Sequence, residues 1–133
     1  MLDLMLSTLV GLLTVDRMMF MMIGVTVGIF IGVLPGLGGI AGLSLMLPFV
    51  YGMEPIAAVA MLIGLLAVVP TADTFSSVLM GISGGSSAQA TVVDGFPMAK
   101  RGEAARALSA AFFASMIGGL FGALVLTGTV IVA

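Results

Sequence analysis

Residues 18–53, MMFMMIGVTVGIFIGVLPGLGGIAGLSLMLPFVYGM, contain no charged side chain, and a glycine–proline cluster lies in their middle. Met18 to Leu34 is long enough to cross a slightly thinned or tilted bilayer, which takes about 20 apolar residues per helix. Leu34-Pro35-Gly36-Leu37-Gly38-Gly39 then breaks the helix, because proline lacks a backbone donor and glycine permits a positive φ. Ile40 to Tyr51 is a second, shorter apolar helix. The stretch predicts a membrane protein with a helix break inside its apolar region.

The composition of the whole chain supports this fold class. Of its 133 residues, 61% are hydrophobic and only 8% are charged, whereas a soluble domain carries about 25% charged residues. A soluble globular domain, a disordered chain and a nucleic-acid-binding protein are therefore excluded. The absence of Cys and His excludes disulfides and the common zinc sites. We expect an all-α integral membrane protein in a lipid bilayer, with about four to five transmembrane helices and no nucleic-acid partner.

The chain is predicted to form a single membrane domain over residues 1–133. Residues 1–17 are expected to be a retained interfacial segment, since no basic residue precedes their apolar run as in a signal peptide. A third helix is predicted from Ile56 to Val69, stopped by Pro70. Two short helical pieces are expected to follow, on either side of a break at Ser83 to Ser86.

The remaining sequence predicts a loop and one last crossing. Asp94-Gly95-Phe96-Pro97 has the composition of a turn, and residues 94–106 are expected to be a cytoplasmic loop because they include Lys100, Arg101 and Arg106. Arg17 marks the start of the first long helix in the same way, so four crossings between the two basic clusters would place both on one side. Ala107 to Ala133 is long enough for the final crossing.

Glycines at every fourth position, Gly24, Gly28, Gly32 and Gly36, form a stripe without side chains on the first long helix. Such a stripe lets a second helix approach closely, and helix packing is its expected role. A shorter face of small residues is present on the last helix, comprising Ser115, Gly118, Gly119 and Gly122.

Two glycine-rich segments are the candidate substrate site. A helix that begins near Gly39 has free N–H groups, which in transporters face anionic substrates, although a tight surface turn explains the same residues. The segment from Ser83 to Gln89 offers hydroxyls, an amide and open backbone, and its alternative is a flexible surface loop. The predicted substrate-binding residues are Gly36, Gly38, Gly39, Ser83, Gly84, Gly85, Ser86, Ser87 and Gln89.

Asp73 is the only acidic residue between Glu54 and Asp94. An acid inside a membrane domain is by default a candidate functional group, but Asp before a helix is also an ordinary N-cap. With its hydroxyl neighbours it forms the predicted coupling-ion site, which comprises Thr71, Asp73, Thr74 and Ser76.

The motifs resemble one family. Gly32-Val33-Leu34-Pro35-Gly36-Leu37-Gly38 resembles the glycine–proline signature of the large membrane subunit of tripartite tricarboxylate transporters, the TctA type. Val93-Asp94-Gly95-Phe96-Pro97-Met98-Ala99-Lys100-Arg101-Gly102 is similar to that family's Asp-Gly-aromatic-Pro-Met-Ala loop. The similarity extends over roughly residues 20 to 125.

The resemblance implies a secondary transporter of the bacterial cytoplasmic (inner) membrane. Its partners would be a small membrane subunit and a periplasmic solute-binding protein that delivers an organic acid, and a sodium or proton gradient would drive carboxylate uptake. The chain would be the N-terminal portion of an inverted-repeat permease and would need the remaining part, or a homo-oligomer, to complete its site. No other cofactor is implied.

The alternative is a small non-transporting or channel-like membrane protein that assembles through its glycine-rich helix faces. An enzyme is not expected, because the sequence has no nucleophile elbow, phosphate-binding loop or paired carboxylates at helical spacing.

Overall fold

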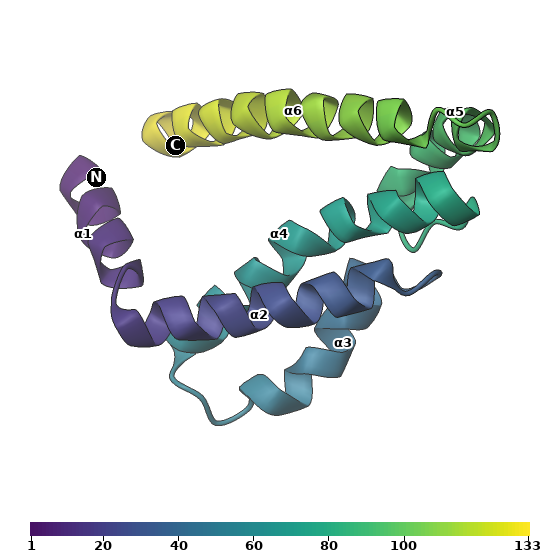
Figure 1. The fold of residues 1–133 in the computed structure, drawn as a ribbon. Coiled ribbons are helices and arrows are strands. Elements are labelled where there is room, and N and C mark those ends of the chain that lie inside the picture. Colours follow the sequence, from purple (N-terminus) through teal and green to yellow (C-terminus); the bar gives the residue numbers. More distant parts are fainter.

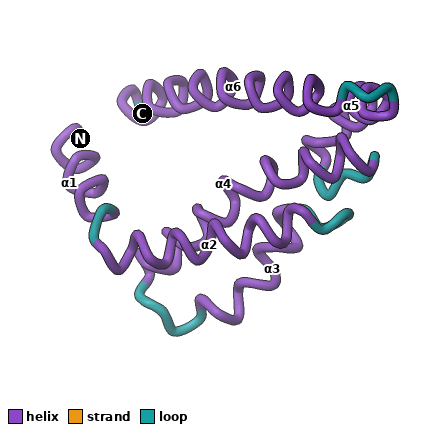
Figure 2. The backbone as a smooth tube through the Cα atoms, viewed as in Figure 1, coloured by secondary structure: helices purple, strands orange, loops and turns teal.

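A computed structural model describes all 133 residues. Every regular element is helical, and the helices are α1 (Leu2–Leu12), α2 (Val15–Val33), α3 (Gly39–Val50), α4 (Pro55–Met80), the short 3-10 helix η1 (Ser86–Ala88), α5 (Gln89–Lys100) and α6 (Ala104–Val132). Figure 2 shows that only short loops separate them. The predicted all-α membrane class is confirmed, since α2, α4 and α6 are long and apolar enough to cross a membrane.

The centre of the fold is the pair α2–α4, with α3 packed on one side of it (Figure 1). Gly24, Gly28 and Gly32 are buried, and a β-carbon on any of them would collide with the backbone of α4. The collisions would occur successively at Met61, Leu65 and Val69. The glycine stripe is therefore a helix-packing surface, as predicted. Gly36 lies beyond it, in a turn with φ of 84°.

A small apolar core lies between α2, α3 and α4. Ile31 of α2 packs with Leu65 and Val69 of α4, and all three side chains are buried. Leu43 and Met46 of α3 lie against this cluster. The core thus fixes α3 beside the middle of α4, and both ends of the Leu34–Gly38 turn are held in place.

The third predicted helix does not stop at Pro70. The helix α4 runs through this proline to Met80, and Gly81 ends it in the left-handed conformation with φ of 71°. Pro70 is exposed, whereas Ala72, Asp73 and Val78 beyond it are buried. Tertiary packing of the following residues therefore outweighs the one backbone hydrogen bond that proline removes.

The expected turn at Asp94–Pro97 is also wrong, because these residues lie inside α5. Phe96 packs against Gly81, and the Lys100 ammonium lies 4.5 Å from the centre of the Phe96 ring. The part of residues 94–106 outside a helix is Arg101 to Glu103, and the cytoplasmic placement of that loop stays a prediction.

The two basic clusters lie at opposite ends of the α2–α4 pair, whereas four crossings between them would bring both to one side. The number of crossings stays a prediction. The two helices run parallel, as the successive contacts of Gly24, Gly28 and Gly32 require. The returning helix α3 has 12 residues and spans only about 18 Å at 1.5 Å per residue. Arg17 is at the start of α2, and α5 lies against the end of α4 (Figure 1).

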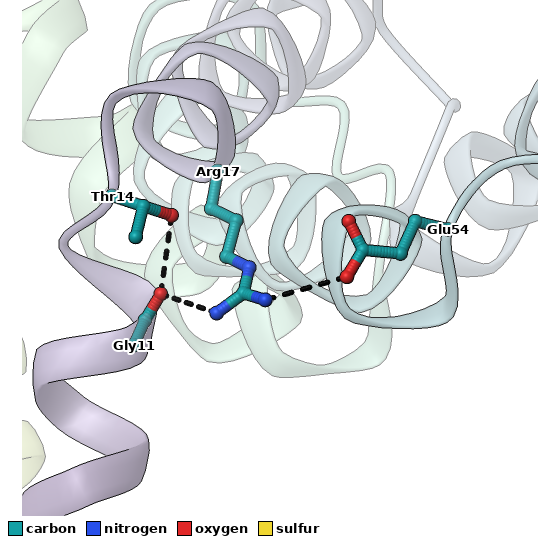
Figure 3. Close-up of polar contacts among 4 residues, drawn as sticks. All are labelled: Gly11, Thr14, Arg17 and Glu54. Carbon is teal, nitrogen blue, oxygen red and sulfur yellow. Dashed lines mark hydrogen bonds and ion pairs between the residues drawn. The ribbon is translucent and has the colours of Figure 1, made fainter.

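Arg17 joins three elements at its end of the fold (Figure 3). Its guanidinium donates to the carbonyl oxygen of Gly11 at the end of α1 and pairs with Glu54 at 3.3 Å, directly before α4. Asp16 and Arg17 belong to α2 and not to the N-terminal segment, which is helical over Leu2–Leu12 and has no buried residue.

The helix α6 packs against α4 and α5 near its start. Phe112 packs against Phe75 of α4 with ring centroids 5.4 Å apart, and Ala107 is the one buried residue of α6. The helix then diverges from the α2–α4 pair (Figure 1). Nothing lies within 4 Å of the β-carbon positions of Gly118, Gly119 and Gly122, so the second small-residue face is not used within the chain.

Candidate functional site

Two glycine-rich breaks separate the helices: the first is Leu34–Gly38, between α2 and α3, and the second is Gly81–Gly85, between α4 and η1. The two breaks meet beside α4. A β-carbon on Gly84 would lie 2.6 Å from the carbonyl oxygen of Leu37, and one on Gly38 would collide with the carbonyl group of Gly84. Because neither residue has a side chain, the two backbones touch directly. Segments that are more than 40 residues apart in the sequence therefore form one continuous wall.

This wall encloses one side of a pocket of about 720 Å³, a volume typical of small-molecule sites. No charged side chain lines it. It is lined by Gly36, Gly38, Gly39, Ile40, Ala41, Leu43, Leu66, Pro70, Gly84, Gly85, Ser86 and Ser87.

Seven of the nine predicted substrate-binding residues line this pocket, namely all but Ser83 and Gln89. The sequence did not indicate its apolar part, from Leu66 and Pro70 of α4 and Leu43 of α3. In the sequence these residues lie within ordinary apolar helices, and only the fold turns them toward the breaks.

The pocket has hydrogen-bond donors at the start of α3. The first intrahelical bond there runs from the Gly42 amide to the Gly38 carbonyl, so the amides of Gly39, Ile40 and Ala41 have no partner within the helix. The exposed residues Ser86 and Ser87 bring two hydroxyl groups to the same pocket. Neutral donors of this kind can bind a carboxylate without a basic side chain.

The predicted coupling-ion residues do not form one cluster. Thr71 is exposed, while Asp73, Thr74 and Ser76 are buried on α4. The Thr74 hydroxyl donates to the carbonyl oxygen of Pro70 at 3.0 Å. None of the four lines the pocket.

Asp73 is not an N-cap, because it lies well inside α4. Its side chain is only 2% exposed. The carboxylate oxygen Oδ1 accepts the Gly84 amide at 2.7 Å, and Oδ2 accepts the Gly85 amide at 3.0 Å. The Ser76 hydroxyl donates to the backbone carbonyl oxygen of Asp73 at 3.0 Å and also lies 3.3 Å from Oδ1. A buried carboxylate requires such partners, and each hydrogen bond to a charged group contributes about 1.5–3 kcal/mol.

Ser77 is the functional candidate that the sequence prediction did not include. Its side chain is fully buried, and Oγ has no hydrogen-bond partner. It lies one helical turn after Asp73 on α4. Its position within a run of hydroxyl residues was the one available signal.

Comparisons with known proteins agree with the motifs. The model of the tripartite tricarboxylate transporter TctA family matches residues 18–133. An uncharacterised 52.8 kDa protein of Agrobacterium vitis, from the TAR-I ttuC' 3' region, is 32% identical over 114 residues. These residues are 86% of this chain and 23% of that protein, so the chain spans about a quarter of its relative's length. No solved structure matches the chain.

Proposed function

Because the chain belongs to the tripartite tricarboxylate transporter TctA family, we propose that it is part of a membrane permease for organic acids. A periplasmic binding protein would deliver the acid, a small membrane subunit would complete the transporter in the bacterial inner membrane, and a sodium or proton gradient would drive uptake. The observation that carries the proposal is the pocket between the two glycine-rich breaks.

The chemistry of this pocket suits an organic acid. The unpaired amides of Gly39, Ile40 and Ala41 and the hydroxyls of Ser86 and Ser87 are donors for carboxylate oxygens. Leu43 and Leu66 offer an apolar surface to the carbon skeleton. The predicted ion-coupling role of Thr71, Asp73, Thr74 and Ser76 belongs to the same proposal, with these residues beside the pocket and not in its lining.

The experiment measures the uptake of labelled mono-, di- and tricarboxylates by cells that express the complete permease and both partner subunits. Ser87→Phe would fill the pocket from an exposed position and should lower uptake at least about tenfold, which corresponds to about 1.4 kcal/mol. Ser109→Phe changes another exposed serine, on α6 and away from the pocket, and should have no effect.

Uptake that is unchanged in Ser87→Phe would refute the pocket as the substrate site. Uptake that needs neither a gradient nor the binding protein would instead support the channel-like alternative.

A further inference from the structure

Asp73 holds the second glycine-rich break in a fixed place. Met80 ends α4, and the chain then folds back along the helix until Gly84 and Gly85 reach the carboxylate of Asp73. Each carboxylate oxygen accepts one backbone amide, at 2.7 Å and 3.0 Å. Two hydrogen bonds to one planar group fix both the position and the orientation of the loop.

The same loop also touches the first break. The carbonyl oxygen of Leu37 and the backbone of Gly38 lie against Gly84. The Gly84–Gly85 backbone is therefore in contact with both Asp73 and the Leu37–Gly38 turn. Because Gly38, Gly84 and Gly85 all line the pocket, the position of this loop determines the shape of the pocket.

We propose that Asp73 is a positioning residue, whose carboxyl group anchors the Gly84–Gly85 backbone and thereby joins the two breaks into one pocket wall. Its effect on uptake rests on the proposed function, whereas its effect on the loop does not. The anchor also determines which donors face a substrate. The amides of Gly84 and Gly85 are used by Asp73 and are therefore not available to a substrate carboxylate.

This role differs from direct binding of a coupling ion. Both oxygens of Asp73 accept backbone hydrogen bonds, so the carboxylate has a structural role in the loop without a bound cation. An asparagine at this position has one acceptor oxygen, and its amide nitrogen would face a backbone N–H group. Asp73→Asn should therefore release one end of the anchor, while Asp73→Glu keeps both oxygens on a longer side chain.

The natural chain has no cysteine, so an introduced cysteine is a unique reporter of the loop. Ala88, in η1 directly after the loop, is 6% exposed. In purified protein, Ala88→Cys should react slowly with a maleimide reagent. Adding Asp73→Asn should speed the reaction about tenfold, because labelling of a buried thiol follows the population of the locally open state. Asp94→Asn, which changes an exposed acid on α5, is the matched control and should leave the rate unchanged.

Amide hydrogen exchange tests the anchor in the protein without the Asp73 substitution, in case Asp73→Asn does not fold. The amides of Gly84 and Gly85 should exchange more slowly than those of Ile82 and Ser83. Equal exchange at all four residues would overturn the proposal. Neither measurement requires transport, so an anchor could be established even if no organic acid is taken up. If Asp73→Asn abolishes the gradient dependence of uptake but changes neither exchange nor labelling, Asp73 binds the coupling ion and the positioning role is wrong.

Discussion

Gly28 and Leu65 touch through their backbones: a β-carbon on Gly28 would lie 2.8 Å from the carbonyl oxygen of Leu65. The same contact recurs one helical turn away on either side, at Gly24 and Gly32. Where lipid removes the hydrophobic driving force, helix association depends in part on van der Waals packing, which small residues favour because they let two helix backbones approach closely. The α2–α4 interface is therefore sensitive to single methyl groups.

Gly28→Ala should destabilise the fold by about 1–3 kcal/mol, the usual cost of overpacking a tight interface. The measurement is thermal unfolding in detergent micelles. Gly119→Ala on α6 is the control, since nothing lies within 4 Å of its β-carbon position, and it should be neutral or slightly stabilising because alanine favours a helix. Equal melting temperatures for both variants would show that the α2–α4 contact is not formed.

Gly84 and Gly85 should differ sharply in their tolerance of alanine. A methyl group on Gly84 would meet the Leu37 backbone at 2.6 Å, whereas one on Gly85 has its nearest neighbours at 3.7 Å. Gly84→Ala should thus separate the two breaks and lower organic-acid uptake at least about tenfold. Gly85→Ala should retain most of the activity. The reverse order of the two variants in an uptake assay would contradict the described wall.

Ser76 and Ser77 are neighbouring buried serines whose alanine variants should differ in stability. Ser76→Ala removes the hydroxyl that lies 3.3 Å from Asp73 Oδ1 and should cost about 0.5–1.5 kcal/mol of stability. Ser77→Ala removes a buried hydroxyl without a partner and should be neutral or stabilising, because an unsatisfied buried donor is itself costly. Thermal unfolding ranks the two variants. A loss of uptake in Ser77→Ala without a loss of stability would assign the Ser77 hydroxyl to a bound ligand or ion.

Arg17 should contribute more to stability than Glu54. The ion pair between them is partly exposed, with 22% of the Arg17 and 60% of the Glu54 side chain accessible, so Glu54→Gln should cost no more than about 1 kcal/mol and less at high salt. Arg17→Ala also loses the hydrogen bond to the Gly11 carbonyl. It should therefore lower the melting temperature further than Glu54→Gln at every salt concentration. An equal decrease in melting temperature for the two variants would mean that the hydrogen bond from Arg17 to the Gly11 carbonyl does not contribute to stability.

The parallel arrangement of α2 and α4 predicts the membrane topology. Asp16→Cys and Glu103→Cys each replace an exposed acid near one of the basic clusters. In sealed right-side-out vesicles, an impermeant maleimide reagent should label only one of the two, because the clusters lie at opposite ends of the pair. Labelling of both cysteines from the same side would require a different path for the chain between them.

Sequence patterns predicted the parts of the fold that depend on local chemistry. Uninterrupted apolar runs located α2, α3 and α6 within a few residues, and the four-residue spacing of Gly24, Gly28 and Gly32 identified a packing face. The composition of residues 36–39 and 84–87 located most of the pocket lining. In each case the signal lies in the residues themselves and not in their partners.

The errors occurred where packing between distant residues decides the structure. The sequence predicted a helix end at Pro70 and a turn at Pro97, yet α4 and α5 continue through these prolines. The sequence also did not predict the partners of Asp73, because its carboxylate accepts backbone amides that lie 11 and 12 residues further along the chain. A sequence pattern reports spacing along one helix, whereas this contact depends on a loop that folds back.

The parallel alignment of α2 and α4 has an electrostatic consequence. Antiparallel neighbours largely cancel their macrodipoles, but parallel ones add them, at about half an elementary charge per helix end. The C-terminal ends of α2 and α4, which carry the negative ends of the dipoles, both point toward the end of the fold where α5 lies. Lys100, Arg101 and Arg106 follow at that end, so the field of the helix pair and the basic side chains are of complementary sign, while Asp16 lies at the positive end of α2.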